Sequence, residues 1–256
     1  MQSNSPSSSV RASISKLLPR MRNAAAKLAL SETARSVMKS RLTYLSARKL
    51  RVLERCAGKL DRDGIRGDFI ECGIALGGSA ILLSSLLSPQ RNFHGYDVFE
   101  MIPPPGPKDE RDSHERYKVI KSGTSGGIGG EQYYGYIQNL RDVVVDNFKK
   151  FGLAVDDKRI SLHQGLFEHT LRFEPDAQIA LAHIDCDWHD PVRLCLERIY
   201  AQLPIGGYMI LDDYNAYQGC RKATDGFLAE KHDLVLVATA PNAIIRRIPA
   251  AANSAN

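Results

Sequence analysis

The stretch "IALAHIDCDWHDPV" (Ile179–Val192) decides the fold of this chain. It begins as an apolar run with the length of a buried strand and ends in three acids, Asp185, Asp187 and Asp190. Asp190 precedes Pro191, which predicts a helix with Asp190 as its N-cap and Pro191 at its first position. A buried strand that leads directly into a helix is the unit from which parallel sheets are built.

The pattern recurs in "GGYMILDDYNAY" (206–217), an apolar strand that ends in Asp212 and Asp213. Five more strands are predicted, at 67–74, 92–99, 160–165, 233–240 and 243–248. Helical periodicity is seen between most of the strands and before the first, at 45–60, 79–87, 136–152, 191–203 and 219–231. This alternation predicts an α/β fold, a seven-stranded, mostly parallel sheet with helices on both faces. A two-residue turn separates the last two strands, so one strand should run antiparallel.

Composition excludes several classes of protein. The 256 residues are 43% hydrophobic and 25% charged, enough for one substantial domain. No apolar run approaches the roughly 18 residues of a membrane span, so we expect no membrane partner. The net charge of +5 arises from residues 1–31, and the remainder is neutral, which argues against nucleic-acid binding. The five cysteines form no CxxC pair or zinc spacing, which indicates a reduced, cytoplasmic protein.

Residues 1–39 are predicted to be a basic, Ser-rich tail and N-terminal helix, partly disordered, before a domain at 40–250. An acid-free, Arg- and Ser-rich start also fits an organellar transit peptide. The N-terminal helices offer a surface for a homo-oligomer.

The segment 100–136 interrupts the alternation of strands and helices. It is rich in Pro and Gly and ends in Tyr133, Tyr134 and Tyr136. Loops of this length are usually functional or disordered. We interpret the segment as a mobile lid over the carboxyl ends of the strands, and a passive insertion is the alternative. The tyrosines would line an acceptor pocket or, as the alternative, pack on the solvent-facing side of the lid.

The stretch "ECGIALGGS" (71–79) follows the first strand and has the position of a nucleotide-binding loop. Ala75 stands where a pyrophosphate would need glycine, and Glu71 would repel a phosphate. Asp97, at the end of the second strand, is placed to accept hydrogen bonds from ribose hydroxyls. These residues favour S-adenosylmethionine as the cofactor over NAD. The predicted contacts are Glu71, Gly73, Gly77, Ser79 and Asp97, with Gln164 and Phe167 near the adenine. The alternative role of Gly77-Gly78 is tight packing of the helix on the strand.

Four stretches together resemble the macrocin O-methyltransferase family. They are "GDFIECGIALGGSAIL", "HGYDVFEMIPPP", "HIDCDWHDPV" and "GGYMILDDYNAYQGCRKATDGF". Members of the family are class I enzymes with a Rossmann-like fold, which use S-adenosylmethionine to methylate sugar hydroxyls of natural products. The resemblance implies this fold over residues 40–248 and a small-molecule acceptor such as a glycoside or another polyol.

The resemblance also implies a divalent metal site, usually occupied by magnesium. Its ligands would be Asp185, Asp212 and Asp213, and Asp187 matches the general base. Many relatives continue after the second Asp with Tyr and Glu-Ser-Thr, whereas this chain has Trp188 and His189. That departure concerns the acceptor side of the site.

The chemistry of methyl transfer gives a reason for these carboxylates that does not depend on the family resemblance. An aliphatic hydroxyl is barely ionised at neutral pH, so its methylation needs a base, a Lewis acid or both. Asp185 and Asp187 are two apart and would share one face of a strand, whereas Asp212 and Asp213 share a site only if the chain turns there. Four carboxylates without a cation would repel one another.

The roles of two side chains and the function of the whole chain have alternative interpretations. His189 would be an alternative base or a substrate contact, and Trp188 a packing residue or a stacking surface. For the whole chain, the competing functions are an NAD-dependent oxidoreductase and a catalytically inactive relative that binds S-adenosylmethionine.

Overall fold

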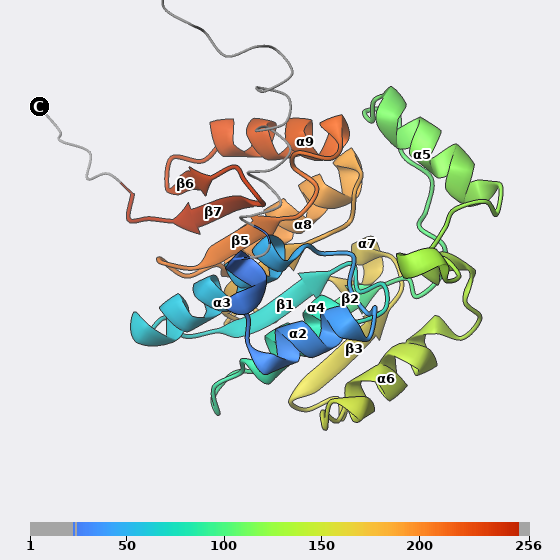
Figure 1. Cartoon of the computed structure of the whole chain (residues 1–256). Helices are drawn as coiled ribbons and strands as arrows, with labels where there is room; N and C mark the ends of the chain where they lie inside the picture. Colours follow the sequence, from blue (N-terminus) through green and yellow to red (C-terminus); the bar gives the residue numbers. More distant parts are fainter. Residues whose placement is uncertain (1–22, 24, 251–256) are drawn as a thin grey trace, which may run out of the picture.

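The computed structural model describes residues 23 and 25–250 of the chain (Figure 1). Most of the predicted N-terminal tail, residues 1–22, therefore lies outside the described residues. No helix in the described part is long and apolar enough to cross a membrane.

Seven strands form one sheet in the order β3-β2-β1-β4-β5-β7-β6. The strands are β1 Asp68–Cys72, β2 Phe93–Asp97, β3 Ile160–Gln164, β4 Ile179–Ile184, β5 Tyr208–Leu211, β6 Leu234–Ala238 and β7 Ala243–Arg247. The pairs among β1 to β5 are parallel, and β7 pairs antiparallel with both β5 and β6. All seven predicted strands and the antiparallel last strand are confirmed. β4 and β5 are buried along their whole length, as unbroken apolar runs predict, whereas the edge strand β6 is partly exposed.

Helices cover both faces of the sheet (Figure 1). They are α2 Glu32–Lys39, α3 Ala47–Arg62, α4 Gly78–Ser85, α5 Arg111–Lys121, α6 Leu140–Lys150, α7 Phe167–Thr170, α8 His189–Gln202 and α9 Gln218–Ala229. One apolar core joins α2, α3, α4 and α6 to the sheet, and a second joins α7, α8 and α9 to the opposite face. Alternate strand residues supply the two cores: Phe69 packs in the first and Ile70 in the second.

The strand register brings three carboxyl ends together. Cys72 of β1 pairs with Ile184 of β4, which pairs with Leu211 of β5. The chain leaves the sheet directly after these residues, with Asp185 N donating to Cys72 O at 2.8 Å and Asp212 N donating to Ile184 O at 3.0 Å. The two acidic motifs therefore begin side by side.

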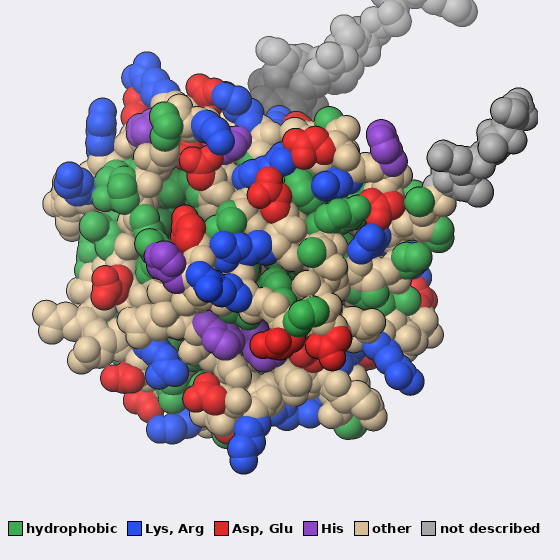
Figure 2. Space-filling view, turned by 180° about the vertical axis from the view of Figure 1, so that it is seen from behind, with side chains coloured by type: hydrophobic (Ala, Val, Ile, Leu, Met, Phe, Trp, Pro, Cys, Tyr) green, Lys and Arg blue, Asp and Glu red, His purple; other side chains and the backbone are tan. Residues whose placement is uncertain are grey.

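The inserted segment 100–136 contains a helix that was not predicted from the sequence, α5, which projects at one edge of the molecule beside α9 (Figure 1). The short 3-10 turns Ile128–Gly130 and Tyr134–Tyr136 follow it. Whether the segment moves as a lid stays a prediction. On the face seen in Figure 2, basic and acidic side chains are interspersed.

The helix after β4 begins earlier than predicted. Its N-cap is Trp188, so Asp190 lies in the first turn and not at the cap. The capping hydrogen bond comes from elsewhere in the chain: His189 N donates to Asp109 Oδ1 at 2.8 Å. A carboxylate of the inserted segment thus satisfies a backbone donor at the start of α8.

Candidate active site

A cavity of about 440 Å³ lies at the carboxyl ends of the parallel strands. Its wall combines the loop after β1, the ends of β2 and β3, both acidic motifs and part of the inserted segment. This is the position at which ligands bind in open α/β sheets.

The loop after β1 approaches the first acidic motif closely. Gly73 has φ +95°, and a Cβ there would overlap the carbonyl oxygen of Asp185. Glycine at this position therefore sets the distance between the predicted cofactor loop and the carboxylates. Gly73 and Ser79 both line the cavity, as predicted.

Asp97 lines the cavity and also holds the loop in place. Its Oδ2 accepts hydrogen bonds from Ile74 N at 2.6 Å and Ala75 N at 3.2 Å, and its Oδ1 accepts one from Phe99 N at 2.7 Å. Burial raises the pKa of Asp97, although the three backbone donors oppose this. Glu100, which sequence reasoning missed, lines the same side of the cavity.

Three predicted cofactor residues do not line this cavity. Glu71 is a fully buried residue of β1, where it pairs with His183 of β4. Gly77 is the N-cap of α4, and a Cβ there would lie 3.1 Å from Val144 of helix α6. Gln164 is exposed, with its amide donating to Val98 O at 3.4 Å. Phe167, by contrast, does lie on the cavity wall.

Three carboxylates converge on the cavity floor. Ligand atoms of Asp185, Asp187 and Asp213 lie within 4.8 Å of one another. Burial raises the pKa of Asp185 and of Asp187 well above the ordinary value, and neighbouring carboxylates raise both further. Burial and Asp212 likewise raise the pKa of Asp213. Hard cations prefer such oxygen donors, so this donor set fits a divalent cation.

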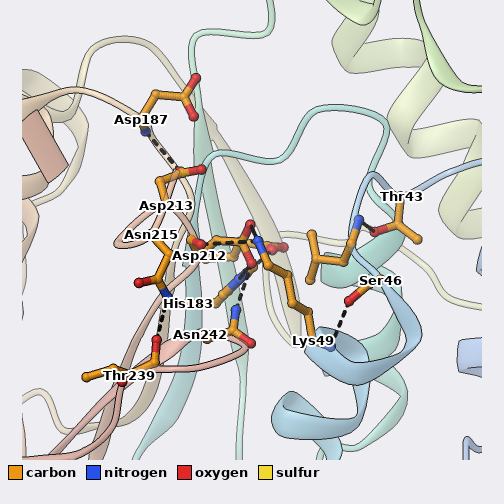
Figure 3. A network of polar contacts seen from close by, with 12 residues as sticks. Thr43, Ser46, Lys49, His183, Asp187, Asp212, Asp213, Asn215, Thr239 and Asn242 are labelled. Atoms are coloured by element: carbon orange, nitrogen blue, oxygen red, sulfur yellow. Dashed lines mark hydrogen bonds and ion pairs between the residues drawn. The ribbon is translucent and has the colours of Figure 1, made fainter. Parts of the chain in front are cut away.

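Asp212 belongs to a different set of contacts (Figure 3). Lys49 Nζ donates to Asp212 Oδ2 at 2.5 Å, and Asn242 Nδ2 donates to Oδ1 at 2.7 Å. Burial opposes the charge on Asp212, but His183 and Lys49 outweigh it and lower the pKa. The predicted ligands Asp185, Asp212 and Asp213 all line the cavity. Asp185 belongs to two groups of ligand atoms that lie within 4.8 Å of one another, one with Asp187 and Asp213 and the other with His183 and Asp212.

A buried pair supports Asp212 from below. Glu71 Oε1 and His183 Nδ1 are 2.6 Å apart, both side chains fully buried, and His183 Nε2 lies 3.7 Å from Asp212 Oδ1. Burial opposes protonation of His183, but Asp212 and Glu71 raise its pKa well above the ordinary value. Glu71 therefore acts beneath the cavity floor, which corrects its predicted place as a direct cofactor contact.

Some, but not all, of the predicted acceptor-binding residues line the cavity. Trp188, Tyr133 and Tyr134 line the cavity. Tyr136 instead donates its hydroxyl to Ile120 O at 2.5 Å. His189 does not line the cavity, and its ring bonds to Asp190 Oδ1 at 2.7 Å.

Besides Glu100, four further polar residues in or beneath the cavity wall were not predicted from the sequence. They are Lys49, Arg116, His183 and Asn242. A signal existed for one of them: a histidine inside a fully buried strand needs a polar partner, and Glu71 sits in the adjacent buried strand. The other three come from distant segments with no distinctive pattern.

Comparison with known proteins agrees with this geometry. Residues 9–236 match the macrocin O-methyltransferase (TylF) family. A tetracenomycin rhamnosyl 4'-O-methyltransferase of Streptomyces olivaceus, named for 8-demethyl-8-(2,3-dimethoxy-alpha-L-rhamnosyl)-tetracenomycin-C, is 28% identical over 72% of this chain and 67% of its own. Demethyldecarbamoylnovobiocin O-methyltransferase of Streptomyces niveus is 24% identical over 73% of this chain and 68% of its own. The solved structure of the O-methyltransferase NovP has a TM-score of 0.65 at 22% identity, covering 81% of this chain and 82% of NovP.

These matches agree with the cofactor loop, the class I strand order and the paired acidic motifs described above, and they do not support the NAD-dependent alternative. The chain belongs to the macrocin O-methyltransferase family and is an S-adenosylmethionine-dependent O-methyltransferase.

Proposed function

We propose that this enzyme methylates a hydroxyl of a sugar, or of a similar natural-product acceptor, at a site that also holds a divalent cation. The observation that carries the proposal is the convergence of Asp185, Asp187 and Asp213 within 4.8 Å, on the floor of a cavity shared with the loop after β1.

The cofactor would lie on the side of the cavity formed by Gly73, Ser79 and Asp97. Gly73 allows the loop to approach the acidic motif, and Asp97 fixes the loop through backbone hydrogen bonds. Phe167 lines the same cavity and is the candidate contact for the adenine. S-adenosylmethionine supplies an electrophilic methyl group, so the enzyme must bring an acceptor oxygen into line with it.

We assign the cation to Asp185 and Asp213, which belong to one of two groups of ligand atoms within 4.8 Å, because Asp212 of the other group is already paired with Lys49. Magnesium is the expected ion, because it prefers carboxylate oxygens. A bound divalent cation supplies Lewis acidity, which lowers the pKa of a hydroxyl. Asp212, the third ligand that the family resemblance implies, is held by Lys49 and Asn242 and is left to a separate test.

Asp187 is the candidate general base. Its carboxylate is accessible from the cavity, and its backbone N–H donates to Asp213 Oδ2 at 3.2 Å, which fixes its position. Burial and the neighbouring acids raise the pKa of Asp187 well above the ordinary value, which makes it a stronger base than a free aspartate. His189 does not line the cavity and its ring is bonded to Asp190, so it is the weaker candidate.

A sugar-like acceptor is supported by two observations. The related proteins from Streptomyces olivaceus and Streptomyces niveus are named for methylation of a rhamnosyl group and of a novobiocin precursor. The cavity wall near Asp187 contains Tyr133, Trp188 and Tyr217, and aromatic faces pack well on the apolar face of a sugar ring.

The test is methyl transfer from labelled S-adenosylmethionine to a panel of glycosides. The wild-type enzyme should label at least one glycoside, and Asp187→Asn should bind S-adenosylhomocysteine normally without turnover. Binding of S-adenosylhomocysteine and metal without turnover on any acceptor would instead support a catalytically inactive relative.

A further inference from the structure

One basic side chain reaches the cavity from the inserted segment. Among the described residues that line the cavity, Arg116 of α5 is the one Lys or Arg. Its guanidinium carbon lies 5.5 Å from the centroid of the Tyr133 ring. The rest of the wall carries carboxylates, aromatic rings, aliphatic side chains and small residues, so the positive charge of Arg116 is distinct from its surroundings.

The start of α5 is fixed to the body of the protein. Gln218 N, at the start of α9, donates to Asp112 Oδ2 at 2.9 Å, and Lys222 pairs with Glu110 at 2.7 Å. Asp109, just before α5, accepts from the start of α8, and a Cβ at Gly219 would overlap its carboxylate. Arg116 is therefore presented by an anchored helix.

The short-range ion pairs around the cavity do not include Arg116. Asp212 pairs with Lys49, and Asp190 lies 3.3 Å from Lys108. Among the described residues, no carboxylate oxygen lies within 4.0 Å of the Arg116 guanidinium. Asp187 is near enough for Arg116 to lower its pKa slightly against the larger effect of burial, but the two form no direct bond.

Arg116 is half-buried and hydrogen-bonds Tyr217, but its guanidinium pairs with no carboxylate of the described residues. Such a guanidinium is suited to bind an anion. Its planar fork matches the oxygens of a carboxylate or a phosphate, and such charge-assisted pairs are stronger than neutral hydrogen bonds. The neighbouring Tyr133 ring limits hydration of the guanidinium on one side. The expected position of the acceptor lies between this wall and Asp187.

We propose that Arg116 is a specificity-determining residue that binds an acidic group of the acceptor, a carboxylate or a phosphate, close to the hydroxyl that receives the methyl group. This inference rests on the proposed function, since it places an acceptor beside Asp187. It names an acidic sugar derivative as the substrate class, and it gives the inserted helix a role in substrate recognition.

The test measures binding to the full chain saturated with S-adenosylhomocysteine and magnesium. The probes are methyl glucoside, glucuronate and glucose 1-phosphate, which differ in whether they carry no acid, a carboxylate or a phosphate. We expect at least one acidic probe to bind about tenfold more tightly than the glucoside. The stronger of the two identifies the source of the acidic group.

Variants of Arg116 test whether this side chain causes the preference for acidic probes. Arg116→Met should bring acidic and neutral probes within about threefold of each other, and Arg116→Lys should retain part of the preference as a point charge. Lys118→Met, an exposed residue of the same helix, is the matched control and should keep the preference.

Three outcomes would overturn the inference. They are no preference for either acidic probe in the wild type, a preference unchanged in Arg116→Met, and a loss of S-adenosylhomocysteine affinity in that variant, which would assign Arg116 to the cofactor carboxylate. Failure of the proposed function is distinguishable, because such a chain would transfer methyl to no hydroxyl acceptor, whatever its charge.

Discussion

Lys49 and Asp212 are 163 residues apart in sequence, yet Lys49 Nζ lies 2.5 Å from Asp212 Oδ2. The same ammonium donates to Asp212 O at 3.1 Å. Two bonds to one residue fix the turn after β5, where the chain leaves the sheet and Asp212 and Asp213 diverge. Lys49 therefore fixes the Asp212 carboxylate, and Asp212 lines the cavity together with Asp213.

Lys49→Met should lower the free energy of unfolding by about 2 kcal/mol, because the buried Asp212 carboxylate loses a charge-assisted donor. Urea unfolding measures this loss. Lys59→Met on the same helix removes an exposed pair with Asp63 and should change stability by about 0.5 kcal/mol or less. Equal losses of unfolding free energy in the two variants would show that the Lys49 contact with Asp212 stabilises the fold no more than an exposed ion pair does.

The cation ligands are tested by calorimetric titration of Mn²⁺. Asp185→Asn and Asp213→Asn should each lower the affinity by at least about tenfold, since even residues that only support a ligand contribute that much. Asp190→Asn, on the cavity wall but outside the group, is the control.

Asp212→Asn decides between the two groups of ligand atoms that share Asp185, one with Asp187 and Asp213 and the other with His183 and Asp212. Because Lys49 and Asn242 already occupy this carboxylate, we expect the Mn²⁺ affinity to stay within about threefold of the wild type. A loss as large as that of Asp185→Asn would show that Asp212 leaves Lys49 to bind the cation.

The carboxylate cluster predicts a pH dependence of stability. Burial and mutual repulsion raise the pKa of Asp185 and Asp187 above 3.8 in the folded protein, so the folded state holds protons that the unfolded chain releases. Their contribution to stability is fully present below a pH of about 4 and is lost as the pH rises through the raised pKa values.

This dependence is measured by thermal unfolding in chelator across that range. Asp187→Asn should show a weaker decline than the wild type, and saturating Mn²⁺ should reduce the wild-type decline, because the cation replaces the protons. Identical pH slopes in the wild type and Asp187→Asn would contradict the assigned pKa directions.

Sequence reasoning succeeded where the physics is local. Strands such as β4 and β5 are short apolar runs buried on both faces, and parallel strands place their carboxyl ends at one edge. The convergence of the acids after β4 and β5 could therefore be predicted. Asp97 was placed at the cavity because it ends the second strand, and Ser79 because it belongs to the loop after the first strand.

Long-range polar contacts could not be predicted in this way. Nothing in the local pattern of α3 shows that Lys49 meets Asp212, and the polar helix α5 follows a Pro-rich run that resembles a loop. Asp190 looked like a cap because it precedes Pro191, but Asp109 from the inserted segment bonds to the first turn instead. Glu71 was misplaced because its partner, His183, lies on another strand.

Gly73 links the cofactor loop to the acidic motif, so Gly73→Ala should affect both. We expect a loss of about 3 kcal/mol in unfolding free energy, from backbone strain at φ +95° and overlap with Asp185. Gly64→Ala is the control: φ there is +68° and a Cβ would meet nothing within 4 Å. Its loss should be about 1 kcal/mol. Unfolding in urea compares the two, and equal losses would contradict the close approach at Gly73.

If Asp187 is the general base, replacing it should impair methyl transfer without changing cofactor binding. Asp187→Asn should bind S-adenosylhomocysteine with unchanged affinity and lose methyl transfer by about 100-fold or more, because no base takes the hydroxyl proton. Single-turnover kinetics measure the loss. Retained turnover in this variant would remove Asp187 as the base.

The central claim, a cation-dependent O-methyltransferase site on Asp185 and Asp213, is tested most directly by methyl transfer from labelled S-adenosylmethionine to the glycoside panel, before and after removal of metal with EDTA. We predict that transfer is lost on chelation, while S-adenosylhomocysteine still binds, and that added magnesium restores it. Full transfer by the chelated enzyme would contradict the claim.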